Sequence, residues 1–293
     1  MAPDRSTTPA VTENGSRRWP VALAALAVTA TLVIAAVLLR PEESAPTAAP
    51  QSPPSAPSLV VGDGRTVTLL SLGGSATDAL LDRVAAGLGD ATEQVERFWG
   101  TDWTREITVV ATDSPAQFAG AAPGAPAEMA AVAVADSVDT DRRVASGQRI
   151  VLGPGAGRMS DAALRVVLTH ELFHYAARAD TAPDAPRWIT EAVADYLARP
   201  APDATTPPVP APVALPADSD FESPEPGLSQ AYDRAWLFAR FVADRHGPAA
   251  LRELYRRAAG RHMEAVDTVL RDVTGADPGQ LLQRWRQWLA EPR

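Results

Sequence analysis

The sequence predicts an α+β protein, with a small mixed sheet in the first half of its folded part and helices throughout the second half. Short β-branched and small-residue runs lie between residues 59 and 152, and amphipathic helical periods follow from residue 161 onward. One uncharged apolar stretch precedes this region near the N-terminus. With 293 residues, the chain is long enough to bury a core around a polar site.

The first 57 residues divide into three segments by composition. Residues 1–19 are polar and without a hydrophobic period, which predicts a short disordered tail. Residues 20–39 carry no charge, and about 20 residues at a rise of about 1.5 Å cross a hydrocarbon core of about 30 Å, so we expect a transmembrane helix. Residues 40–57 are rich in proline, alanine and serine, which predicts an extended linker.

The charges on either side of the apolar stretch predict its orientation. Arg17 and Arg18 precede the stretch, whereas Arg40 follows it together with Glu42 and Glu43, so the positive charge predominates on the N-terminal side and the tail is expected in the cytoplasm. Residues 58–293 would then form an extracytoplasmic domain at the cell membrane. A cleaved signal peptide is the alternative interpretation, but its apolar part usually spans only about 7–15 residues, so we favour the anchor.

The folded part begins near Leu59, and hydrophobic periods predict its elements. Runs that are β-branched or composed of small residues predict strands at residues 67–72, 107–111, 131–135 and 149–152. Apolar residues at helical spacing predict helices at residues 78–99, 161–178, 186–199, 229–246, 248–259, 263–273 and 278–289. The proline-rich segment 200–228 is long for a connection, and we expect it to form a rim or lid over a site.

Composition excludes several classes of function. The 27 basic side chains, all of them arginine, and 36 acidic ones give a formal charge of −9, with no long basic run that would favour nucleic acid as a partner. The use of arginine alone indicates a GC-rich genome, such as that of an actinobacterium. The chain has no cysteine, which excludes disulfides, thiolate metal sites and cysteine nucleophiles. Any metal must be bound by histidine and carboxylate.

The helix expected at 161–178 carries the motif His170-Glu171-Leu172-Phe173-His174. Ser160 is a favourable N-cap for this helix. Spacing residues at about 100° places Glu171 inside the apolar stripe, where a carboxylate is costly unless it meets a cation, a metal-bound water or hydrogen-bond donors. His170 and His174 lie one turn apart on the same side, so both can reach one metal ion.

The alternative to a metal site is a pair of structural histidines in a core. A single histidine on an apolar face is more often structural than a ligand. In a chain of this composition, however, the pattern His-Glu-x-x-His arises by chance in only about three of a thousand cases. His246 and His262 stand alone near helix ends, and we assign them no role.

A catalytic zinc site normally has three protein ligands, so a third ligand must come from elsewhere. Glu191 lies 17 positions after His174 on the next expected helix, and Asp195 follows one turn later on the same face. We expect Glu191 to bind the metal and Asp195 to accept the remaining ring N–H of a ligand histidine. The alternative for Glu191 is an exposed helical carboxylate, which its apolar neighbours disfavour.

The residues HELFH, followed on the next helix by WITEAVADYLA, resemble the gluzincin metallopeptidases, and most closely their peptidase-MA-like branch. The similarity covers roughly residues 105–290. It implies a zincin-like fold and a zinc cofactor bound by His170, His174 and Glu191, with Glu171 as the general base.

The sequence departs from the family pattern in two places. The spacing of 16 residues between His174 and Glu191 is slightly shorter than in thermolysin or the large aminopeptidases, and Ala192 stands where glycine is common. The exopeptidase signature Gly-Ala-Met-Glu-Asn is absent. An aminopeptidase is therefore unsupported, and we expect an endopeptidase that acts on protein or peptide substrates.

Peptide hydrolysis also needs a donor for the oxyanion and a surface that binds the substrate. Tyr232 is the best candidate donor, ahead of Tyr175 and Tyr196, because related enzymes place a Tyr or His on a later helix across the cleft. An edge strand usually binds an extended peptide by backbone pairing, and either 131–135 or 149–152 could provide it.

Two other functions compete with a membrane-anchored zinc peptidase. One is a zincin-fold domain that has lost catalysis and acts as an extracytoplasmic binding or scaffolding module, although all motif carboxylates are present. The other is an intramembrane protease, which we set aside because the motif lies about 130 residues beyond the apolar stretch, on a helix with charged residues. The oligomeric state stays open.

Overall fold

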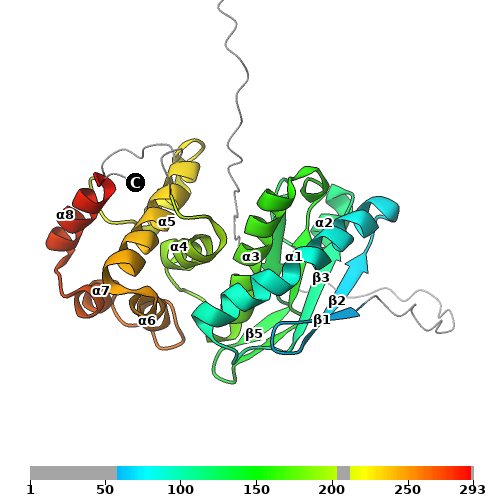
Figure 1. The fold of residues 1–293 in the computed structure, drawn as a ribbon, viewed down its shortest axis with the longest axis horizontal. Helices are drawn as coiled ribbons and strands as arrows, with labels where there is room; N and C mark the ends of the chain where they lie inside the picture. Colours follow the sequence, from blue (N-terminus) through cyan, green and yellow to red (C-terminus); the bar gives the residue numbers. More distant parts are fainter. Residues whose placement is uncertain (1–57, 203–211, 292–293) are drawn as a thin grey trace, which may run out of the picture.

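The computed structural model describes residues 58–202 and 212–291, which form an α+β fold with two unlike halves (Figure 1). A five-stranded sheet with helices on its faces makes up the first half, and the second half is helical. The expectation of an α+β protein with a small mixed sheet and a helical C-terminal half is therefore confirmed.

The main sheet has the strand order β1-β2-β3-β7-β4. The central strands β2, β3 and β7 are parallel, while β1 pairs with β2 and β4 pairs with β7 in antiparallel fashion. A separate hairpin is formed by β5 and β6. The strands span Ser58–Val61 (β1), Arg65–Ser71 (β2), Glu106–Ala111 (β3), Ala131–Val134 (β4), Ser137–Asp139 (β5), Val144–Ser146 (β6) and Arg149–Leu152 (β7).

Helices cover both faces of this sheet. The helices α1 (Ser75–Trp99) and α3 (Asp161–Ala177) share a core with Val109 and Ile150 of the sheet. On the opposite face, the short helix α2 (Pro115–Ala121) buries Phe118 against Val110 and Val151. Alternate side chains of β3 and β7 thus pack into two separate cores, because successive side chains of a strand point to opposite faces of the sheet.

The helical half packs on the far side of α3. It consists of α4 (Arg187–Ala198), α5 (Gly227–His246), α6 (Pro248–Ala258), α7 (Val266–Thr274) and α8 (Pro278–Leu289). Short 3₁₀ turns lie at Ala156–Arg158 (η1), Arg178–Asp180 (η2) and Asp218–Glu222 (η3). Aromatic contacts join α5 to α8, such as that between Phe238 and Trp285, whose ring centroids are 5.2 Å apart. Contact between α3 and α4 connects the two halves of the protein.

All strands and helices expected from the sequence are present, with ends that differ by up to three residues. The largest differences are three residues, because α1 begins at Ser75 rather than at residue 78 and α7 begins at Val266 rather than at residue 263. Four elements were not predicted, namely β1, α2, β5 and β6, because they are too short for a hydrophobic period to identify. The expected loop 200–228 contains η3, and its residues 203–211 lie outside the described part of the chain.

The prediction that residues 149–152 could form an edge strand is wrong. Residues 149–152 form β7, which lies between β3 and β4 and is paired on both sides. Because β4 is the last strand in the order, residues 131–134 provide the open edge on this side of the sheet. Sequence patterns do not reveal strand order, since it depends on contacts between distant segments.

The expected tail, transmembrane helix and linker, at residues 1–19, 20–39 and 40–57, lie outside the described residues. Within 58–202 and 212–291, no helix combines the length and hydropathy needed to cross a membrane.

An aromatic cluster supports the helix that carries the motif. The ring of Trp99, at the end of α1, lies edge-on to Phe173 of α3 at 5.7 Å and to Tyr255 of α6 at 5.2 Å. All three side chains are buried. The cluster therefore joins both halves of the protein at α3.

We expect Trp99→Ala to lower the free energy of unfolding by about 3–5 kcal/mol, because it removes a large buried ring from this cluster. Urea unfolding followed by circular dichroism measures the change. Val60→Ala is the control, since the side chain of Val60 is 70 % exposed and its loss should change stability by less than about 0.5 kcal/mol. Equal effects of the two substitutions would contradict the role given to the cluster.

Candidate metal centre

The helix α3 presents the motif at the interface between the sheet and the helical half. As expected, the hydroxyl of Ser160 caps this helix by accepting a hydrogen bond from the N–H of Ala163 at 3.2 Å. His170, Glu171 and His174 are all buried. Apolar side chains would ordinarily fill such an interface. Three buried ionisable side chains are costly there unless each has a partner.

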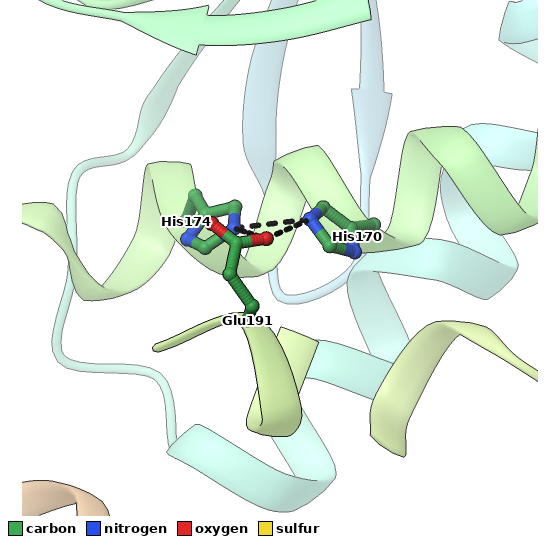
Figure 2. A group of neighbouring side chains, drawn as sticks. All are labelled: His170, His174 and Glu191. Atoms are coloured by element: carbon green, nitrogen blue, oxygen red, sulfur yellow. Dashed lines mark hydrogen bonds and ion pairs between the residues drawn. The ribbon is translucent and has the colours of Figure 1, made fainter. Parts of the chain in front are cut away.

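Glu191 of α4 points toward the two imidazoles of α3 (Figure 2). The Nε2 atoms of His170 and His174 lie 3.1 Å apart. The Oε2 atom of Glu191 lies 3.3 Å from Nε2 of His170 and 3.7 Å from Nε2 of His174. Three potential ligand atoms from two helices thus converge on one point.

This arrangement fits a metal ion. Ligand atoms at about 2.0–2.1 Å from a tetrahedral ion are about 3.3 Å from one another, close to the observed separations. The carboxylate of Glu191 is fully buried, yet neither of its oxygens accepts a hydrogen bond in the described structure. A buried carboxylate without donors is costly unless a cation compensates its charge. The group could therefore hold a metal ion.

Asp195 orients one of the two histidines. Its Oδ1 atom lies 2.9 Å from Nδ1 of His170. Because a carboxylate only accepts hydrogen bonds, Nδ1 carries the proton and Nε2 keeps its lone pair for the metal position. Arg199 in turn binds Asp195 at 3.3 Å and Asp233 of α5 at 2.8 Å, and its guanidinium stacks on Trp236 at 3.8 Å.

The same contacts set the protonation of the ligands. Burial disfavours a charged imidazole, but the carboxylates of Asp195 and Glu191 outweigh it and raise the pKa of His170 well above its usual value. Burial would also raise the pKa of Glu191, but the neighbouring imidazoles lower it to about 2. Glu191 is therefore charged at neutral pH, and protons occupy the centre in the absence of a metal.

Glu171 lies beside the two histidines and Glu191, and a backbone group of the sheet holds its side chain in place. Its Oε2 atom accepts a hydrogen bond from the backbone N–H of Ala133 on β4 at 2.7 Å. Burial raises the pKa of Glu171, while the two imidazoles and the N–H of Ala133 limit the rise. A raised carboxyl pKa suits a group that takes up and releases a proton near neutral pH.

Tyr232 of α5 lies close enough for the charge of Glu191 to act on it. Burial raises the pKa of Tyr232, and the charge of Glu191 raises it further. Its hydroxyl oxygen accepts a hydrogen bond from Arg187 of α4 at 3.0 Å, and its ring packs against Phe221 of η3 at 4.9 Å. The hydroxyl is therefore neutral, and its proton can be donated.

The two other tyrosines considered as donors have different surroundings. The hydroxyl of Tyr175 donates to the backbone oxygen of Glu106, at 3.0 Å, which directs it toward the sheet. The ring of Tyr196 packs against Phe98 at 5.8 Å and lies under the guanidinium of Arg240 at 4.6 Å. Of the three, Tyr232 has the electrostatic contact with Glu191.

Four groups around the centre were not predicted from the sequence. These are the backbone of Ala133 and the guanidinium groups of Arg178, Arg187 and Arg199. Arg187 and Arg199 occupy the two ends of α4, on either side of Glu191 and Asp195, which was a signal available in the sequence. The contact of Ala133 had no such signal, because it depends on strand placement.

We expect the loss of a metal ligand to weaken metal binding more than the loss of a residue that only orients a ligand. Asp195→Asn should weaken binding about 10–100-fold, as the loss of an outer partner does, and Glu191→Ala should weaken it further by removing a ligand. Asp90→Asn, at an exposed position of α1, is the matched control and should bind as the wild type does. Competition with a chromogenic chelator measures each affinity. Full affinity in Glu191→Ala would contradict the assigned site.

The sequence shows no significant match to any protein-family model, nor to any curated protein. The candidate metal centre is therefore inferred from the residues and geometry of the chain itself.

Proposed function

We propose that this protein is a zinc-dependent endopeptidase of the gluzincin type with a zincin-like fold. One observation carries the proposal: Glu191 is fully buried, without a hydrogen-bond donor, and lies 3.3 and 3.7 Å from the imidazoles of His170 and His174. Two imidazoles and one carboxylate suit zinc best among common divalent ions. Glu171 adds a proton acceptor next to these ligands.

The residues of the chain have separate tasks in this proposal. When bound, the metal supplies Lewis-acid chemistry and a water of lowered pKa. His170, His174 and Glu191 hold the ion, and Asp195 keeps the ring of His170 in the binding tautomer. The carboxylate of Glu171 accepts a proton from the attacking water and returns it to the nitrogen of the departing amine.

Tyr232 is the proposed donor to the developing oxyanion. Arg187 supports this role because its hydrogen bond to the phenol oxygen leaves the hydroxyl proton free to point elsewhere. The substrate is proposed to be a peptide in extended conformation along β4, the open edge of the sheet, where backbone groups can pair with it.

A metal-holding module without hydrolytic activity is the second candidate. The observation that favours it is the depth of the centre, since every one of the five proposed residues His170, Glu171, His174, Glu191 and Asp195 is less than a tenth exposed. The presence of Glu171, with a raised pKa and in contact with β4, favours the peptidase.

To separate these candidates, we expect Glu171→Gln to keep about one zinc per chain and to lower peptide cleavage by at least about a hundredfold, because it removes the general base. Metal content is measured by mass spectrometry, and cleavage of a mixed peptide library with and without chelator reports activity. Glu93→Gln, an exposed residue of α1, is the matched control. Unchanged cleavage in Glu171→Gln, or a purified chain that binds no zinc, would refute the peptidase.

We also propose that residues 20–39 anchor the protein in the cell membrane with the catalytic part outside. The uncharged stretch supports this proposal. Leu32→Arg combined with Ile34→Arg should release the full chain from membranes, because each charge costs about 2.5–3.5 kcal/mol at the centre of a span. Alkaline extraction of membranes followed by immunoblotting measures the release. A wild-type chain that begins after residue 39 would instead establish a cleaved signal peptide.

A further inference from the structure

Arg178, directly after the last residue of α3, shares one residue of β4 with Glu171. Its guanidinium donates a hydrogen bond to the backbone oxygen of Ala133 at 2.5 Å. The N–H of the same residue donates to Glu171 at 2.7 Å. One side chain of α3 and one that directly follows α3 thus bind the N–H and the carbonyl of a single residue in the edge strand.

The strand register shows that these groups belong to the open edge. Ala133 stands opposite Ile150 in the antiparallel pair of β4 and β7, and the oxygen of Ala130 accepts from Gly153 on the β7 side. Because backbone groups alternate in direction along a strand, those of Ala133 point away from β7. The contacts of Glu171 and Arg178 are therefore additional to the sheet ladder.

The charge of Arg178 is unusual for its position. Its side chain is half-buried, and burial lowers its pKa. Among the described residues, no carboxylate lies within ion-pair distance of it, although Arg143, Arg199 and Arg257 have such partners. The negative charge that acts most on Arg178 is that of Glu171. A desolvated guanidinium without an ion pair is costly, which indicates a task beyond packing.

We propose that Arg178 is a positioning residue for Glu171 and acts through the backbone of Ala133. Arg178 fixes the carbonyl of Ala133 and so aims its N–H at Oε2 of Glu171. With Oε2 held, the second oxygen of Glu171 can serve in proton transfer. This inference rests on the proposed peptidase function, because it assigns a task within that reaction.

The first test compares the full-length Arg178→Met and Arg165→Met proteins, both loaded with zinc. Arg165 is an exposed arginine of α3 and serves as the matched control. Arg178→Met should lower kcat about 10–100-fold, with KM changed by less than about threefold and one zinc per chain retained, because misplacement of a reacting group by about 1 Å costs up to about 100-fold. Arg178→Lys, which keeps one charged donor, should recover part of the loss. A kcat within twofold of wild type in Arg178→Met would overturn the proposal.

The second test does not depend on activity. If the two side chains act through Ala133, the losses in melting temperature of Glu171→Gln and Arg178→Met should not add in the double variant. Additive losses would overturn the coupling. If Arg178→Met does not fold, Arg178→Lys replaces it in both the double-variant cycle and the kinetic comparison. An unchanged kcat together with additive losses in melting temperature would then overturn the proposal.

Failure of this inference can be told apart from failure of the proposed function. A wild-type protein whose peptide cleavage is absent or insensitive to chelator contradicts the peptidase. A wild-type protein that cleaves, a Glu171→Gln variant that does not, and an Arg178→Met variant with wild-type kcat together contradict only the role of Arg178.

Discussion

The burial of one carboxylate between two imidazoles is the constraint on which the centre of this protein depends. Glu191 is fully buried in the contact between α3 and α4, and it has no hydrogen-bond donor of its own. Such a group destabilises a fold unless positive charge reaches it, either as protons on the imidazoles or as a cation. The raised pKa of His170 and the lowered pKa of Glu191 both result from the attraction between the buried carboxylate and the imidazoles.

The surrounding fold can be understood as support for that contact. On one side, the sheet and α1 pack against α3, and the aromatic cluster around Trp99 holds this helix to α6 as well. On the other side, α5 supports α4 through Arg199, whose guanidinium binds both Asp195 and Asp233. The candidate metal ligands therefore lie on two helices whose positions are set from both halves of the protein, as a precise site requires.

The edge strand β4 has a double character. We propose its free edge as the place where an extended peptide binds, yet the groups of Ala133 on that edge are already bound by Glu171 and Arg178. An exposed strand edge is a liability in many proteins, and side chains that occupy its backbone groups limit unwanted pairing. In this protein the same contacts connect the edge to the side chain that we propose as the general base.

The sequence by itself determined most of the longer elements and the candidate metal ligands that two of them carry. Periodicity located the helices α3 and α4, and the spacing of His170, His174, Glu191 and Asp195 along them predicted that all four side chains share one side of the interface. These predictions are local, because a helix of about 3.6 residues per turn converts sequence spacing directly into direction. The structure brings the four together as the spacing predicted.

Only the tertiary structure decided what surrounds these residues. Strand order placed β4, rather than β7, at the edge, and it brought the N–H of Ala133 to Glu171 across 38 positions of sequence. The roles of Arg178 and Arg187 depend likewise on segments that are distant along the chain. Contacts of this kind have no local period to reveal them, since they arise from packing between elements rather than within one element.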